Sequence, residues 1–118
     1  METLRYSIIY AVIRSEIAER LSLGLITVVN NQVNVRYSDK KLRVLESLYS
    51  PKDYQFISKA IRSLSNNKSI NSVDTINYLS RYSNNLMSVS QLQGIDLAPT
   101  EQSEDWLFRK YVYAGKNR

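Results

Sequence analysis

The chain has 118 residues, of which 43% are hydrophobic and 23% are charged, and its formal net charge is +5 at pH 7. This length and this ordinary balance predict a single folded domain over residues 1–118 and argue against intrinsic disorder. Because the sequence contains neither cysteine nor histidine, the usual zinc and transition-metal sites and the Ser-His-Asp and Cys-His catalytic sets are excluded.

The remaining residue types also argue against a cofactor and a membrane span. The three glycines, Gly24, Gly94 and Gly115, lie too far apart for a phosphate-binding or dinucleotide-binding loop. The 11 acidic residues are scattered and form no calcium-type loop, so we predict no metal, no cofactor and no catalytic residue. With no cysteine, no secretion signal and no apolar run of about 20 residues, the sequence predicts a cytoplasmic protein.

The N-terminal part of the chain has the alternation of β-strands. Residues 4–13 carry apolar side chains at both odd and even positions, which predicts a central strand covered on both faces. The polar residues 14–20 form either a helical turn or a loop. A second strand is expected at residues 21–29, where Gly24 indicates a bulge or a close approach of another backbone.

A β-hairpin is predicted to follow. Asn30 and Asn31 suit a two-residue turn, because asparagine tolerates the left-handed backbone conformation that such turns require. In residues 32–37 apolar and polar side chains alternate strictly, with the two valines and Tyr37 on the inner side. This segment is therefore expected to be the third strand.

Helical spacing begins after the hairpin and covers three segments. Ser38 or Asp39 is expected to cap a helix ending near Tyr49, and Ser50 with Pro51 restarts a helix that runs to about Ser65. A third helix is expected after residue 72. The predicted apolar faces consist of Leu42, Leu45, Leu48 and Tyr49, then Tyr54, Ile57, Ala60, Ile61 and Leu64, then Val73, Ile76 and Leu79.

The C-terminal part adds one candidate strand at residues 86–92, which alternate weakly, and a last helix that opens at residues 99–101. The order of elements predicts an α+β domain, with a three- or four-stranded antiparallel sheet and about four helices packed against it. The acids near the start of the last helix, Glu101, Glu104 and Asp105, are interpreted as first-turn acids on a solvated face.

A group of basic residues near the third strand is a candidate nucleic-acid interface. With the nine tyrosines, these cations match the phosphate contacts and base stacking of single-strand binders. A solvated helix face explains them as well, because acidic and apolar residues interrupt the group. The basic face consists of Arg36, Lys40, Lys41 and Arg43.

The last helix is the candidate protein-binding element, because it is apolar around most of its circumference. Either it is deeply buried in the monomer, or part of it, such as Phe108 with Val112, faces a partner. The residues predicted to contact a partner are Trp106, Phe108, Tyr111 and Tyr113.

Several short motifs, in the same order over nearly the whole chain, resemble an uncharacterised bacterial family known as domain of unknown function 3037. The motifs are Tyr6-Ser7-Ile8-Ile9-Tyr10, Glu19-Arg20, Gly24-Leu25-Ile26, Val35-Arg36-Tyr37, the helix from Leu42 to Leu48, Gly94-Ile95, and the closing segment from Trp106 to Val112. The second strand departs from the family's Asn-Val-Gly-Val type, since it reads Leu21-Ser22-Leu23-Gly24-Leu25.

The resemblance implies a context rather than a chemistry, because the family has no established catalytic residues. Its genes often neighbour HipA-like serine/threonine kinases of toxin–antitoxin modules. It therefore implies a non-catalytic accessory or antitoxin-like partner that docks onto such a kinase. The alternative expectation is a single-stranded nucleic-acid-binding protein that uses the basic, tyrosine-rich face.

Overall fold

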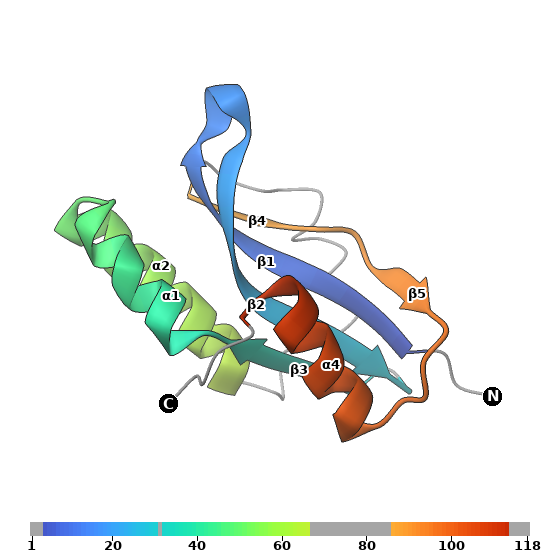
Figure 1. Ribbon diagram of the computed structural model, residues 1–118. Coiled ribbons are helices and arrows are strands. Elements are labelled where there is room, and N and C mark those ends of the chain that lie inside the picture. The colour runs from blue at the N-terminus through green and yellow to red at the C-terminus, as the bar shows by residue number, and fades with distance from the viewer. Residues whose placement is uncertain (1–3, 31, 67–85, 114–118) are drawn as a thin grey trace.

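The computed structural model describes residues 4–30, 32–66 and 86–113, which form an antiparallel sheet with helices packed against both faces (Figure 1). The strand order is β3-β2-β1-β4, and β5 also pairs with β1. The strands are β1 (Leu4–Arg14), β2 (Glu19–Val29), β3 (Gln32–Tyr37), β4 (Met87–Val89) and β5 (Gln93–Ile95).

Strand β1 lies in the centre of the sheet, as its two apolar faces predict. One edge pairs with β2, and the other pairs first with β5, at Leu4–Tyr6, and then with β4, at Ile9–Ala11. Between these two short strands, Ser90 donates its backbone N–H to the Ile8 carbonyl at 3.0 Å, and its hydroxyl accepts the Ile8 N–H at 2.8 Å. The serine side chain thus replaces part of the ladder where the edge strand is interrupted.

The β1–β2 pairing contains the irregularity that Gly24 predicts. Ile9 lies opposite Gly24 while Tyr10 lies opposite Ser22, so Leu23 is an extra residue on β2. A Cβ atom on Gly24 would lie 2.7 Å from the carbonyl oxygen of Arg36 in β3. The glycine therefore serves both a bulge and a close approach of backbone. The connector after β1 is a 3-10 helix, η1 (Ser15–Ile17).

The hairpin between β2 and β3 has the predicted boundaries. Val29 lies opposite Gln32, and Asn30, which follows Val29, has the left-handed φ of 53° that a two-residue turn requires. Val33 and Val35 are buried on one face of β3, whereas Gln32 and Asn34 are exposed on the other.

Two helices follow β3 and pack against one face of the sheet, where they form a core cluster with residues of the strands. They are α1 (Asp39–Val44), extended by the 3-10 helix η2 (Leu45–Ser47), and α2 (Pro51–Asn66). Ser38 caps α1 as predicted, since its hydroxyl accepts the N–H of Lys41 at 3.2 Å. The buried members of this cluster are Ile9, Ala11, Leu23, Ile26, Val28, Val33, Val35, Leu42, Leu45, Ile57, Ile61, Met87 and Val89.

The predicted apolar face of the first helix is wrong at Leu48, which is 51% exposed. The 3-10 helix η2 ends at Ser47 and Leu48 is its C-cap, so the helical spacing that predicted an inward position stops before this residue. The stripe of the second helix is confirmed, because Ile57 and Ile61 are buried and Tyr54, Ala60 and Leu64 pack against the cluster.

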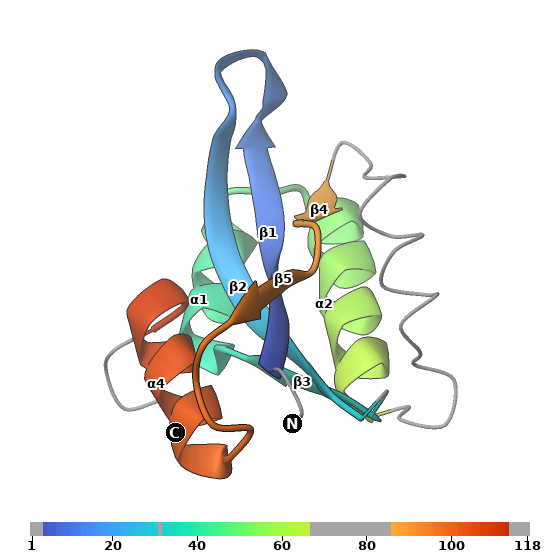
Figure 2. The ribbon, with the colours of Figure 1, turned by 90° about the vertical axis from the view of Figure 1, so that its right-hand side faces the viewer.

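The last helix, α4 (Glu101–Tyr111), covers part of the other face of the sheet, so that α2 and α4 lie on opposite sides of it (Figure 2). Thr100 caps α4 by accepting the N–H of Ser103 at 3.3 Å. A second core cluster forms beneath the helix, and its buried members are Leu4, Leu25, Leu107 and Val112.

The α+β class and the antiparallel sheet are thus confirmed, while the element numbers differ. Within the described residues there are five strands, against three or four predicted, and three α-helices, against about four. Strand β4 lies inside the predicted strand at residues 86–92, whereas β5 lies beyond it and is too short to show alternation. The predicted helix after residue 72 lies outside the described residues. No described helix is long and apolar enough to cross a membrane.

Candidate partner-binding surface

Helix α4 is held firmly on the sheet by its inner side, and this determines which of its side chains face outward. Leu107 has no exposed surface and Val112 is 4% exposed, and both pack with Leu4 and Leu25. The pair Phe108 and Val112 therefore does not present a joint surface to a partner, because Val112 belongs to the core of the monomer. Phe108 itself is half-buried and packs against the same cluster.

Trp106 is the most exposed of the four predicted contact residues, with 43% of its surface accessible. The Nζ atom of Lys110, one turn further along, lies 4.6 Å from the centre of its ring, within the range of a cation–π contact. The indole borders a shallow cleft of about 310 Å³ between α4 and the segment that precedes it. The cleft is lined by Leu97, Ala98, Thr100, Gln102, Ser103 and Trp106.

The other aromatic residues near the end of α4 are half-buried and pack onto the second core cluster. The rings of Tyr6 and Tyr111 stack with their centres 5.5 Å apart and their planes 17° from parallel. The hydroxyl of Tyr6 donates to Gln93 at 3.1 Å. Hydrogen bonding with Tyr111, and then burial, raise the pKa of Tyr6 above its ordinary value of 10.0.

The four residues of the predicted basic face have different surroundings. Arg36 forms ion pairs with Asp105 and, at 3.6 Å, with Glu104. Lys40 approaches the ring of Tyr113 at 5.9 Å, while Lys41 donates to the hydroxyl of Ser22 at 3.0 Å. Burial lowers the pKa of Lys41 below its ordinary value of 10.5. Arg43 is exposed on α1.

These contacts divide the basic residues because they lie on different elements. Successive residues of a helix point about 100° apart, so neighbours in the sequence of α1 reach different neighbours in space. Only residues whose charge is not taken up by a carboxylate remain available to an anion. Arg36 does not meet that condition, since it serves to hold β3 against α4.

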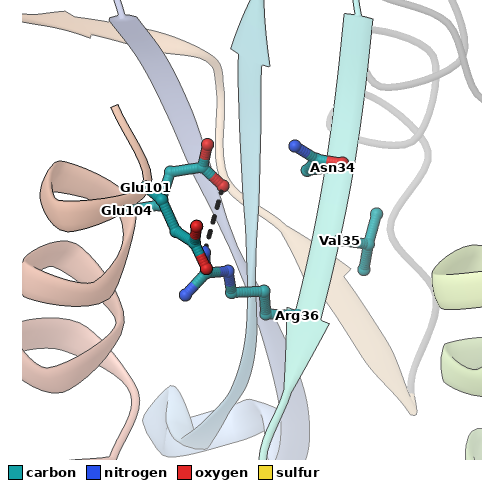
Figure 3. A pocket seen from close by; sticks show the side chains of 5 residues that line it. All are labelled: Asn34, Val35, Arg36, Glu101 and Glu104. Carbon is teal, nitrogen blue, oxygen red and sulfur yellow. Dashed lines mark ion pairs between the residues drawn. The ribbon is translucent and has the colours of Figure 1, made fainter. Parts of the chain in front are cut away.

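A second cleft, of about 360 Å³, lies between β3 and α4 and is lined by Asn34, Val35, Arg36, Glu101 and Glu104. Figure 3 shows the side chains of Arg36 and Glu104 pointing toward each other across it. Glu104 is only 8% exposed and accepts a hydrogen bond from Thr27. The expected solvated face is therefore wrong at Glu104, because the helix turns this acid toward the polar residues of β2 and β3.

The sequence interpretation missed a further cluster on the same side of the sheet. The guanidinium carbon of Arg20 lies 4.0 Å from the ring centre of Tyr10. Tyr10 lies opposite Ser22, the residue that binds Lys41, so these four side chains gather on one face. Tyr10, Ser22 and Arg20 occupy even positions of β1 and β2, which is visible in the sequence. The bulge at Leu23, which is not, determines which of them lie opposite one another.

Acidic groups do not gather into a metal centre in the described part of the chain. No group of three or more aspartates or glutamates there is placed to hold a metal ion. Comparison with models of protein families, with curated proteins and with solved structures found no match to this chain. The family resemblance therefore rests on the quoted motifs alone.

Proposed function

We propose that this chain is a non-catalytic protein-interaction module that docks through the outer side of α4, with Trp106 as its central contact. The observation that supports this most strongly is the exposure of Trp106 beside a cleft, on a helix that is otherwise anchored in the core. Tryptophan is enriched, with tyrosine and arginine, among the residues that dominate the binding energy of protein interfaces.

The rigidity of α4 strengthens this proposal. The helix is fixed by its capping threonine, by Leu107 and by the buried Glu104, so Trp106 is presented in one orientation before a partner arrives. Binding to a preorganised side chain loses less conformational entropy than binding to a mobile one. Phe108, Tyr111 and Tyr113 then form the half-buried border of the contact, and Lys40, which approaches the Tyr113 ring, extends it.

The charges around Trp106 indicate the chemistry of the partner. Lys110 lies against the indole ring, and Arg109 is exposed beside it on the same helix. A complementary surface would offer an apolar pocket for the ring, with carboxylates at its rim. The resemblance supplies the first candidate, a HipA-like serine/threonine kinase, toward which the chain would act as an accessory or antitoxin-like partner.

The experiment is co-expression with a HipA-like kinase encoded beside the gene, followed by mass determination by light scattering and a kinase assay. We expect a stable heteromeric complex that Trp106→Ala weakens by at least tenfold. Phe56→Ala is the matched control, because Phe56 is 50% exposed on α2 at the other face of the sheet. Equal losses of affinity for the two variants would show that Trp106 does not contact the partner. No complex, together with unchanged kinase activity, would exclude the kinase as partner.

A further inference from the structure

Helix α4 covers only part of its side of the sheet. Figure 1 shows it in front of β3 and the adjoining part of β2, whereas no helix of the described residues lies in front of the later part of β1 or of β4 on that side. The residues of β1 that face this side are the even-numbered ones, because Leu4 and Tyr6 pack under α4 whereas Ile9 and Ala11 belong to the opposite cluster. Tyr10 therefore lies on the same side, as does Ile8, which is buried.

The strand register identifies the neighbours of these tyrosines. Tyr10 lies between Ser22 of β2 and Ser88 of β4, and Tyr6 lies opposite Gln93 of β5. Arg20 and Lys41 reach onto the same surface through their contacts with Tyr10 and Ser22. We call this surface the open sheet face, and it consists of Tyr6, Tyr10, Arg20, Ser22, Lys41, Ser88 and Gln93.

The open sheet face combines aromatic rings with cations that no carboxylate of the described residues neutralises. In the described part of the chain, neither Arg20 nor Lys41 forms an ion pair with an acidic side chain. Arg20 is exposed and lies against the Tyr10 ring, and Tyr6 is half-buried in its stack with Tyr111. The remaining members carry hydroxyl or amide groups, which both donate and accept hydrogen bonds.

We propose that the open sheet face binds single-stranded nucleic acid. Unpaired bases stack on tyrosine rings and on guanidinium planes, and the phosphates between them bind cations at the edge of the platform. An acidic peptide would use Arg20 and Lys41 but has no flat group for the rings. A duplex keeps its bases stacked inside, so it would contact only the cations. The combination of rings, cations and hydroxyls on one uncovered sheet face therefore favours a single strand.

This site is separate from the contact proposed around Trp106, which lies on the outer side of α4. It also differs from the basic face expected from the sequence, of which only Lys41 belongs to the open sheet face. The two proposals can therefore fail independently, because nucleic-acid binding is measured on the chain alone, without a protein partner.

The test is fluorescence anisotropy with labelled 20-nucleotide deoxythymidine and uridine strands and a mixed-sequence duplex, at 50 and 200 mM salt. We expect single strands to bind more tightly than the duplex, with affinity falling as salt rises because phosphate contacts release counterions. Tighter binding of either the DNA strand or the RNA strand supports the site and identifies its natural ligand.

Two variants locate the binding. Tyr10→Leu keeps an apolar side chain but removes the ring, and we expect about a 5- to 160-fold loss, the range for one stacked base. Arg20→Gln should weaken binding by about tenfold, whereas Arg62→Gln, the same charge change on an exposed residue of α2, should not. Thermal unfolding of each variant shows whether it is folded.

Three results would overturn the proposal. They are no binding at low salt, duplex binding as tight as single-strand binding, and equal losses for the Arg20 and Arg62 variants.

Discussion

The hydroxyl of Thr27 in β2 donates a hydrogen bond of 3.0 Å to the carboxylate of Glu104 in α4, and both side chains are buried. The same carboxylate oxygen lies 3.6 Å from a guanidinium nitrogen of Arg36. One acid thus satisfies a buried hydroxyl and a half-buried cation from two different strands. This polar contact fixes how α4 crosses the sheet, and so how Trp106 is presented.

Replacing Glu104 with alanine should destabilise the fold. The change leaves the buried Thr27 hydroxyl without its acceptor and leaves Arg36 paired with Asp105 alone, which costs about 1–3 kcal/mol in the free energy of unfolding. Urea denaturation measures it, and Glu101→Ala is the control. Glu101 is an exposed acid in the first turn of the same helix, so its removal should cost no more than about 1 kcal/mol. Equal costs would mean that the Thr27–Glu104 contact contributes no net stability.

Gly24→Ala should be destabilising although no unusual φ is required there. The added Cβ would lie 2.7 Å from the carbonyl oxygen of Arg36, and backbone on both strands must shift to relieve this contact. We expect a loss of about 1–3 kcal/mol, measured by thermal unfolding. Gly94→Ala is the comparison, because Gly94 is exposed in β5. A neutral Gly24 variant would show that β3 moves away from β2 at little cost.

Leu107→Ala tests whether the inner side of α4 contributes to the core of the fold. Leu107 has no exposed surface, so truncation leaves a cavity in the second core cluster and should cost about 2–5 kcal/mol. Phe56→Ala removes a larger side chain that is half exposed, and should cost less than about 1 kcal/mol. Guanidinium denaturation compares the two. The reverse order would contradict the burial described for α4.

The stability of the fold should decline in alkaline solution partly through Tyr49. Its hydroxyl donates to the carbonyl of Val12, and burial, followed by the charge of Asp53, raises its pKa above the ordinary 10.0. The unfolded chain therefore loses this proton first. The contribution of Tyr49 is fully present below about pH 10 and is lost as pH rises through the folded-state pKa.

The variant Tyr49→Phe isolates this contribution. It should be less stable than the parent by about 0.5–1.5 kcal/mol at pH 8, because the hydrogen bond to Val12 is lost. The difference should shrink above pH 10, as measured by urea denaturation across the pH range. A difference that stays constant to pH 11 would contradict the raised pKa.

Local rules predicted much of this fold because several residues determine structure through their own chemistry. The missing Cβ of Gly24, the cap at Ser38, the restart at Pro51 and the alternation in β3 each act within a few residues. Strand β5 could not be predicted, because three residues show no alternation and its pairing partner lies far away in the sequence.

The site was harder to predict than the fold, for a related reason. The sequence grouped Trp106 with three other aromatic residues and did not show that it is the most exposed of them. The burial of Glu104 depends on Thr27, 77 positions away. The contact between Tyr10 and Arg20 depends on the register beyond the bulge at Leu23. A sequence pattern shows which face of a strand or helix a residue occupies, whereas long-range pairing determines which side chains it contacts.

The interrupted edge formed by β4 and β5 has a consequence for how the chain is made. Strands β1, β2 and β3 leave the ribosome before the residues that cover the second edge of β1, so this central strand is an unpaired edge during synthesis. At roughly 5–20 residues per second the exposure lasts on the order of seconds. A nascent chain that stalls before Ile95 would carry an apolar strand open to pairing with another chain.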